Sequence, residues 1–238
     1  MSFSTLTGVN VFFGGFNPDN YGTTLAILDA GLGVTLNGSD VSSHADQSSE
    51  GNDVTQATAS KQPLYNSSDS NFNNQPSFTF DGSSEYLSRA TLASGAASQP
   101  NTVISVYKLA NTTGFHAMHD GVGSGNRHNA ESDGTNLSLN AGSGAYADSV
   151  DTSAHIQLVE YNNTSSKVWI DGVAGSTVSI GTNALNGLAI GVNLNLNGAY
   201  FAGEIAYTLI YAGLLSTANK NSVGNGLATK LGLSWSDI

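Results

Sequence analysis

Two acidic residues near the middle of the chain are the first candidates for catalysis. Glu131 and Asp133 stand two positions apart, so on a strand both carboxylates would face the same side. Glycoside hydrolysis needs two carboxylates that face a sugar across one cleft. Asn136, three residues after Asp133, carries an amide, which cannot act as a general acid. The surrounding sequence, GSGNRHNAESDGTN, predicts a loop or hairpin tip, so we assign no catalytic residues.

A glycine-rich polar segment is the candidate for sugar binding. It carries charged and planar side chains that could hydrogen-bond to hydroxyl groups, and an aromatic residue follows it. A loop without any ligand is the alternative, because connecting segments commonly have this composition. The candidate carbohydrate-binding residues are His116, His119, Asp120, Asn126, Arg127, His128 and Tyr146.

A calcium ion is conceivable in a long polar segment, residues 37–63, which the sequence predicts to be a loop. Asp46, Glu50 and Asp53 could supply the carboxylate oxygens that this hard cation prefers. Their spacing is not that of an EF-hand, and acidic residues in turns also make local hydrogen bonds. We therefore expect no cofactor, with calcium as the alternative. The absence of cysteine excludes disulfides and thiolate metal sites.

Composition limits the kinds of partner that the protein can have. The 238 residues carry 7 basic and 18 acidic side chains, a formal net charge of −11. Such a surface repels nucleic-acid phosphates, and no basic cluster is present to hold an anionic membrane. No apolar run is long enough to span a bilayer, so we expect neither nucleic-acid binding nor membrane insertion.

The first 24 residues differ from the rest of the chain. Turn signals such as Gly14-Gly15 make residues 1–24 irregular, and two interpretations remain open. The segment could contain a first strand, Val9 to Phe13, or it could be an arm that docks on a partner chain. It lacks the pattern of a cleaved signal peptide. The candidate assembly residues are Phe12, Phe13, Phe16 and Tyr21.

Residues 25–238 read as one all-β domain that ends in a helix. Short apolar segments recur between Gly, Asn and Asp turns, which is typical of a sandwich or jelly roll. Ser216 and Thr217 are N-cap candidates for a helix that Gly232 would end. The predicted strands are Leu25–Asp29, Thr102–Leu109, Phe115–Met118, Leu137–Leu139, His155–Tyr161, Lys167–Asp171 (ending in an Asp-Gly turn), Thr177–Ile180, Leu188–Val192 and Tyr200–Tyr211.

Three segments carry a family resemblance: GSDVSSHADQSSEGNDVTQATASKQP (residues 38–63), PSFTFDGSSEYL (76–87) and FAGEIAYTLIYAGLLS (201–216). In this order they resemble motifs of concanavalin A-like lectin/glucanase domains of the laminin-G-like kind. The resemblance implies a two-sheet antiparallel jelly-roll sandwich with a short C-terminal helix. Departures occur at His44, where the family has an aromatic residue, and at Tyr207, where many members are acidic. The glucanases of this fold read E-x-D-x-x-E, which is Glu131, Asp133 and Asn136 here. The matching residues are Gly38, Ser39, Val41, Asp46, Ser48, Gly51, Asn52, Gln56, Ala57, Thr58, Gln62 and Pro63; Pro76, Phe80, Asp81, Gly82, Tyr86 and Leu87; and Phe201, Gly203, Glu204, Ile205, Ala206, Tyr211, Leu215 and Ser216.

These observations lead to three functional hypotheses. The first is a non-enzymatic phage virion surface protein, a capsid decoration or fibre component made in the host cytoplasm. It would contact other virion proteins and copies of itself, as a homotrimer, and a host surface glycan. The alternative is a carbohydrate-binding module of a bacterial surface protein. A glycoside hydrolase ranks third, because the third carboxylate is missing.

Overall fold

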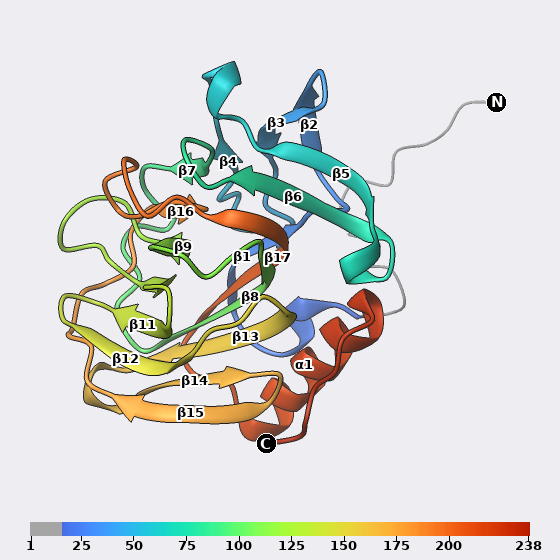
Figure 1. The fold of residues 1–238 in the computed structure, drawn as a ribbon. Coiled ribbons are helices and arrows are strands. Elements are labelled where there is room, and N and C mark those ends of the chain that lie inside the picture. Colours follow the sequence, from blue (N-terminus) through green and yellow to red (C-terminus); the bar gives the residue numbers. More distant parts are fainter. Residues whose placement is uncertain (1–15) are drawn as a thin grey trace.

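The computed structural model describes residues 16–238, which form two facing β-sheets and a C-terminal helix (Figure 1). The prediction of an all-β, two-sheet antiparallel jelly roll with a short helix is confirmed. Hydrogen bonding passes from one sheet to the other because β3 (Asp40–His44) pairs with a strand of each. β2 (Val34–Asn37) forms a hairpin with β3.

One layer, here called the front sheet, contains seven strands joined mainly by neighbouring antiparallel pairs. In spatial order these are β4 (Val54–Thr55), β7 (Leu87–Arg89), β16 (Leu188–Ile190), β9 (His116–Asp120), β10 (Asn129–Ser132), β11 (Asn136–Asn140) and β12 (Gly144–Ser149).

The other layer, here called the back sheet, is built around the two longest strands. β1 (Thr24–Asp29) pairs with the second half of β17 (Ala202–Ala212), which pairs along its length with β8 (Asn101–Leu109). In spatial order the strands are β5 (Leu64–Asp69), β6 (Gln75–Asp81), β17 (Ala202–Ala212, with β1, Thr24–Asp29), β8 (Asn101–Leu109), β13 (Ala154–Tyr161), β14 (Ser166–Ile170) and β15 (Val173–Val178). Short 3-10 helices lie at Pro18–Asn20, Ala59–Lys61, Ser70–Phe72 and Asn163–Ser165.

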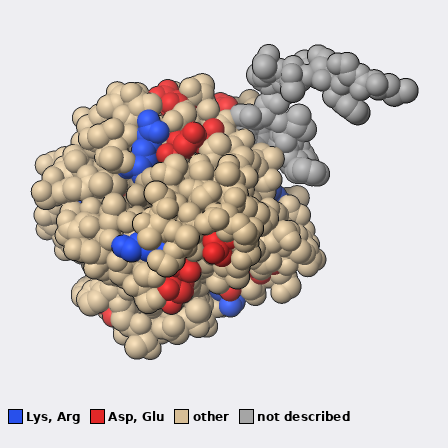
Figure 2. All heavy atoms as spheres, turned by 90° about the horizontal axis from the view of Figure 1, so that it is seen from above, with Lys and Arg blue, Asp and Glu red and all other residues tan. Residues whose placement is uncertain are grey.

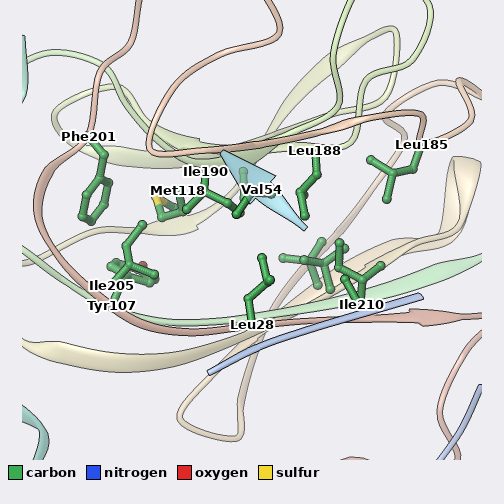
Figure 3. Packing of buried hydrophobic residues seen from close by; sticks show 14 of the residues in the cluster. Leu28, Val54, Tyr107, Met118, Leu185, Leu188, Ile190, Phe201, Ile205 and Ile210 are labelled. Carbon is green, nitrogen blue, oxygen red and sulfur yellow. The ribbon is translucent and has the colours of Figure 1, made fainter. Parts of the chain in front are cut away.

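The main hydrophobic core lies between the two sheets. Figure 3 shows Met118, Leu188 and Ile190 of the front sheet facing Leu28 and Ile205 of the back sheet. All five side chains are almost fully buried. Burial of apolar surface at about 25 cal/mol per Å² makes this contact the main stabilising term of the fold.

The helix α1 (Thr217–Leu231) covers the outer face of the back sheet (Figure 1). Ser216 accepts the N-cap hydrogen bond from Asn219 at 3.2 Å, and Gly232 ends the helix in the left-handed conformation. Val223, Leu227 and Leu231 fall on the buried stripe that their spacing predicts. A second core therefore forms on the side of the back sheet away from the front sheet.

β17 is buried on both faces because a layer lies on each side of it. Its continuous apolar run in the sequence indicated this position. The polar segment 37–63 differs from expectation, since it contains β3 and β4 rather than a loop throughout. Val41 and Val54 are fully buried there, which gives both short strands an attachment to the core.

The residues predicted to form an assembly arm fall into two groups. Phe12 and Phe13, with the predicted strand at Val9 to Phe13, lie outside the described residues. Phe16 is 8% exposed and stacks on Tyr21 with ring centroids 5.9 Å apart. Both belong to the core beneath α1, so they pack on their own domain.

Charged groups are sparse on the surface. Figure 2 shows a few small groups of acidic and basic side chains, some of them side by side, on a face that is otherwise uncharged. No helix among residues 16–238 combines the length and the hydropathy needed to cross a bilayer.

The stability of the fold is expected to depend on the protonation of His155 at the start of β13. Its ring Nδ1 lies 2.7 Å from Asp171 Oδ2, and Nε2 lies 2.9 Å from Asp151 Oδ1. The hydrogen bond to Asp171 is the main cause of a pKa of His155 raised above 6.5; the bond to Asp151 adds to it and burial opposes it. A raised folded-state pKa means that the stabilisation is fully present below about pH 6.5 and is lost as pH rises through the raised value.

Urea unfolding of the parent and of His155→Gln at about pH 5 and about pH 9 checks this dependence. The variant is expected to lose more stability at the lower pH, where the parent ring is charged between two carboxylates. An equal loss at both values of pH would contradict the prediction.

Candidate functional site

An open depression of about 350 Å³ lies on the outer side of the front sheet, where β9 and β10 meet the loop before β17. Its lining combines one exposed aromatic ring, one cation, one carboxylate and two amides, the mixture typical of a polar-ligand site. The lining residues are Phe115, Arg127, Glu131, Asn193, Leu194, Asn195 and Ala199.

A buried ion pair supports the floor of this depression. Asp120 is fully buried and accepts a hydrogen bond from Arg127 Nε at 3.1 Å. The Nη2 atom of Arg127 lies 3.7 Å from Glu131 Oε2. Arg127 is therefore held between two carboxylates, and its guanidinium has a fixed position at the edge of the cavity.

Asp120 also accepts hydrogen bonds from backbone amides of two loops that are far apart in the sequence. Gly121 donates to Oδ1 at 2.8 Å and Leu194 donates to Oδ2 at 3.0 Å. A Cβ at Gly121 would lie 1.7 Å from the carbonyl oxygen of Asn126, so only glycine permits this turn. The carboxylate of Asp120 thus connects β9, the loop 121–128 and the loop 191–201.

Burial and the charge of Arg127 shift the pKa values of Asp120 and Glu131 in opposite directions. Burial raises the pKa of Asp120 to about 7, although Arg127 and the two amides favour the charged form. Burial also raises the pKa of Glu131, opposed by Arg127 and by a hydrogen bond from Asn129. Perturbed carboxyl groups beside a cavity are common at functional sites.

The outer face of the front sheet continues from the depression to Tyr146. Glu131 pairs in register with Ser138, which pairs with Tyr146, so the three side chains share one face across β10, β11 and β12. The alternate residues Leu137 and Leu139 point into the core. Tyr146 is 61% exposed and stands about 10 Å from Glu131 across two strand spacings.

The structure places the seven candidate sugar-binding residues in three different settings. Arg127 lines the depression, and the fully buried Asp120 does not, but it holds Arg127 in place through the ion pair. Asn126 supports the loop, because its side chain donates to the Val122 carbonyl at 3.1 Å. Tyr146 lies on the same outer face, two strands away.

The three histidines lie inside the protein rather than on the outer face. His119 is hydrogen-bonded to Tyr161 at 2.8 Å, and burial lowers its pKa to about 3. His128 stacks on the same tyrosine at 4.4 Å, and burial lowers its pKa to about 4. His116 lies 2.9 Å from the carbonyl oxygen of Tyr200. All three are buried and offer no surface to a sugar.

Glu131 and Asp133 do not form a catalytic pair. Glu131 is on β10 and faces the depression, whereas Asp133 lies in the turn after the strand. Asp133 accepts hydrogen bonds from the amides of Thr135 and Asn136, which lower its pKa to about 2. Glu131 is the only carboxylate in the lining, so the two-carboxylate arrangement of glycoside hydrolysis is absent from this depression.

The candidate calcium ligands support a loop by hydrogen bonding. The Asp46 carboxylate accepts bonds from the backbone of Ile27, Ser48 and Asn52, each at 2.8 Å. Asp53 accepts from the backbone of Asp46 at 2.8 Å. Across residues 16–238, no group of three or more histidine or acidic side chains is placed to hold a metal ion.

Sequence reasoning missed Phe115 and the loop residues Asn193, Leu194 and Asn195 as parts of a site. The alternating asparagines in VNLNLNG were a usable signal, since a polar loop next to a strand commonly carries binding groups. Their position beside Arg127 depends on the pairing of β16 with β9, which the sequence does not show.

Comparison with known proteins bears on the fold. No protein-family model matches the sequence, and a search of curated proteins finds no relative. Solved structures do match. Domain 4 of AbnA, a GH43 extracellular arabinanase from Geobacillus stearothermophilus in complex with arabinotriose, is similar with a TM-score of 0.58 and 18% identity over 87% of this chain and 99% of that one. The shared feature is the β-sandwich jelly-roll fold.

Two larger proteins contain a similar domain. Trypanosoma rangeli sialidase in complex with sialic acid matches with a TM-score of 0.55 and 12% identity, over 86% of this chain and 32% of the sialidase chain. The botulinum neurotoxin serotype D binding domain matches with a TM-score of 0.59 and 12% identity, over 86% of this chain and 51% of that one. The protein thus spans about a third and about half of these two chains.

Proposed function

We propose that this protein is a non-catalytic carbohydrate-binding domain whose main contact is the depression at Arg127. The observation that carries the proposal is the juxtaposition of Phe115, 60% exposed, with the fixed groups of Arg127 and Glu131. An aromatic ring packs against the C–H face of a sugar, and charged hydrogen bonds orient its hydroxyl groups. Asn193 and Asn195 add amides to the same lining.

The charge of the site favours a neutral glycan. Asp120 and Glu131 flank the single cation Arg127, whose charge is already engaged with them. An acidic sugar would add a negative charge beside Glu131 on a protein of net charge −11. Hydroxyl groups can use the remaining donors and acceptors without this repulsion.

The fold likenesses support carbohydrate binding more than a virion role. Two of the similar solved structures were determined with saccharides, arabinotriose and sialic acid. The depression has one carboxylate, which supports a binding rather than a hydrolytic role. The assignment to a phage virion surface, with homotrimer formation and other virion proteins as partners, stays a prediction.

Substitution of Phe115 by alanine is expected to weaken glycan binding about two- to tenfold, because the aromatic contact contributes about 0.5–1.5 kcal/mol. A glycan array would first identify a neutral ligand, and calorimetry would then measure a dissociation constant in the micromolar to millimolar range, or about −8 to −4 kcal/mol. Glu131→Gln, which keeps the shape and removes the charge, is expected to weaken binding as well.

Leu36→Ala is the matched control, because Leu36 is also exposed, on β2, outside the depression. It is expected to leave the affinity unchanged. If no neutral glycan binds, or if Phe115→Ala and Leu36→Ala behave alike, the proposal is wrong. Release of reducing sugar by the parent protein would contradict the non-catalytic role.

A further inference from the structure

A second open depression, of about 630 Å³, lies where the edge strand β12 of the front sheet meets the edge strand β15 of the back sheet. We call it the edge groove. Gly175 of β15 approaches β12 so closely that a Cβ there would lie 2.6 Å from the carbonyl oxygen of Ala147. The edge groove shares no lining residue with the Arg127 depression. Its lining places an exposed aromatic ring, Tyr146, beside the polar side chains of Asn136, Asp148, Ser149 and Ser176.

Tyr146 is held over the front sheet although its side chain is 61% exposed. Its hydroxyl hydrogen-bonds to the Asp133 carboxylate, and this bond is the main reason that the pKa of Tyr146 lies above its ordinary value. Asp133 lies in the turn between β10 and β11, whereas Tyr146 stands on β12, so the ring extends across β11 to reach it. A ring in this position presents one face to solvent, which is the face that packs against a sugar.

Phe115 and Tyr146 are the two most exposed aromatic side chains among residues 16–238. They lie on the same outer face, because Phe115 lines the depression with Glu131, and Glu131 shares its face with Ser138 and Tyr146. Phe115 directly precedes β9, so three strand spacings of about 4.8 Å, or about 14 Å, separate it from β12. A single sugar ring cannot contact both side chains at this separation, whereas a short linear oligosaccharide can.

The surface between the two aromatic rings is suited to hydroxyl groups. Glu131 and Ser138 are partly exposed there and can form hydrogen bonds with a sugar. Both depressions are open to solvent, so a chain can continue past either ring. We propose that the carbohydrate site extends from the Arg127 depression across β10 and β11 to Tyr146 and the edge groove, and that it binds an internal stretch of a linear neutral polysaccharide. This inference rests on the proposed carbohydrate-binding function and specifies its ligand.

A length series tests the extension. The glycan array carries linear cello-, xylo- and arabino-oligosaccharides from the monosaccharide to the hexasaccharide, and calorimetry then measures each length of the type that binds. The affinity is expected to rise about two- to tenfold from the disaccharide to the tetrasaccharide, because only the longer chain reaches both rings. The polysaccharide of the same linkage, whose sugar units are nearly all internal, is expected to bind as well.

Tyr146→Ala is expected to remove this gain, weakening tetrasaccharide binding about two- to tenfold while leaving disaccharide binding unchanged. Phe115→Ala is expected to weaken the binding of both. Tyr146→Phe keeps the ring and loses only the bond to Asp133, so most of the tetrasaccharide affinity is expected to remain. Tyr86→Ala is the matched control, because Tyr86 is a partly exposed tyrosine outside both depressions, and it is expected to leave every affinity unchanged.

The outcomes separate this extension from the proposed function. Equal affinities for disaccharide and tetrasaccharide would overturn the extension and leave the Arg127 site standing, as would a tetrasaccharide affinity that is the same in the parent and in Tyr146→Ala. Binding of the oligosaccharides without binding of the polysaccharide would overturn the internal mode. An array on which no neutral glycan binds would overturn the carbohydrate function and the extension together.

Discussion

Substitution of Arg127 by alanine is expected to lower the free energy of unfolding by about 3–5 kcal/mol and to remove glycan binding. The variant leaves the Asp120 carboxylate fully buried without its cation, 3.1 Å from where Arg127 Nε stood. Removing one member of a buried ion pair is this costly where the remaining carboxylate is ionised, so the unfolding is measured at about pH 9, above the pKa of about 7 to which burial raises Asp120. Urea unfolding and calorimetric glycan titration measure the two effects.

The companion variant Asp120→Asn separates stability from binding. It keeps a side chain of the same shape that can still accept from the Leu194 amide. Combined with Arg127→Ala, it is expected to recover part of the lost stability but none of the glycan affinity, because in the proposed site the guanidinium contacts the ligand. If Arg127→Ala costs less than about 1 kcal/mol, the ion pair does not hold the site together.

The second large effect is expected at Lys220, which connects α1 to the back sheet. Its Nζ lies 3.0 Å from Glu160 Oε1 and 4.1 Å from the ring centroid of Trp169. Both charged residues are 8% exposed. Lys220→Met keeps the apolar chain but leaves the Glu160 charge unpaired, so a loss of about 3–5 kcal/mol is expected on urea unfolding.

The double variant Lys220→Met with Glu160→Gln is the control for this pair. Because neither charge then remains buried, most of the stability is expected to return, and the double-mutant cycle gives the coupling energy. A double variant no more stable than Lys220→Met would show that the pair acts through packing alone. Trp169 fluorescence is a convenient signal, since this ring lies directly under Lys220.

Local signals in the sequence were sufficient for the longest strands and for the helix, whereas β2 to β7, β10 and β12 were not predicted. The apolar run at Tyr200–Tyr211 indicated a strand buried on both faces, and β17 occupies that place. The Asp171-Gly172 turn has both residues at positive φ, as the hairpin between β14 and β15 requires. These features are encoded within a few residues of one another, so periodicity and turn chemistry reveal them.

The candidate site was only partly predictable, because its residues come from segments that are far apart in the sequence. Asp120 and Arg127 were selected from a polar segment, but their partner Leu194 is 74 residues from Asp120. The histidines of the same segment were also predicted to bind sugar, yet His119 and His128 are buried against Tyr161. Which side chains of a polar segment point outward depends on strand register and bulges, such as the one at Ala130 and Glu131.

The sequence by itself determined that this chain is an all-β jelly roll, where its principal strands run, and where its helix begins and ends. Those properties follow from residue spacing, helix caps and turn residues, all of which act between near neighbours in the sequence. Only the tertiary structure decided that Phe115, Arg127, Glu131 and Asn193 share one depression. This arrangement arises from sheet pairing between distant segments, whose choice depends on burial across the whole core.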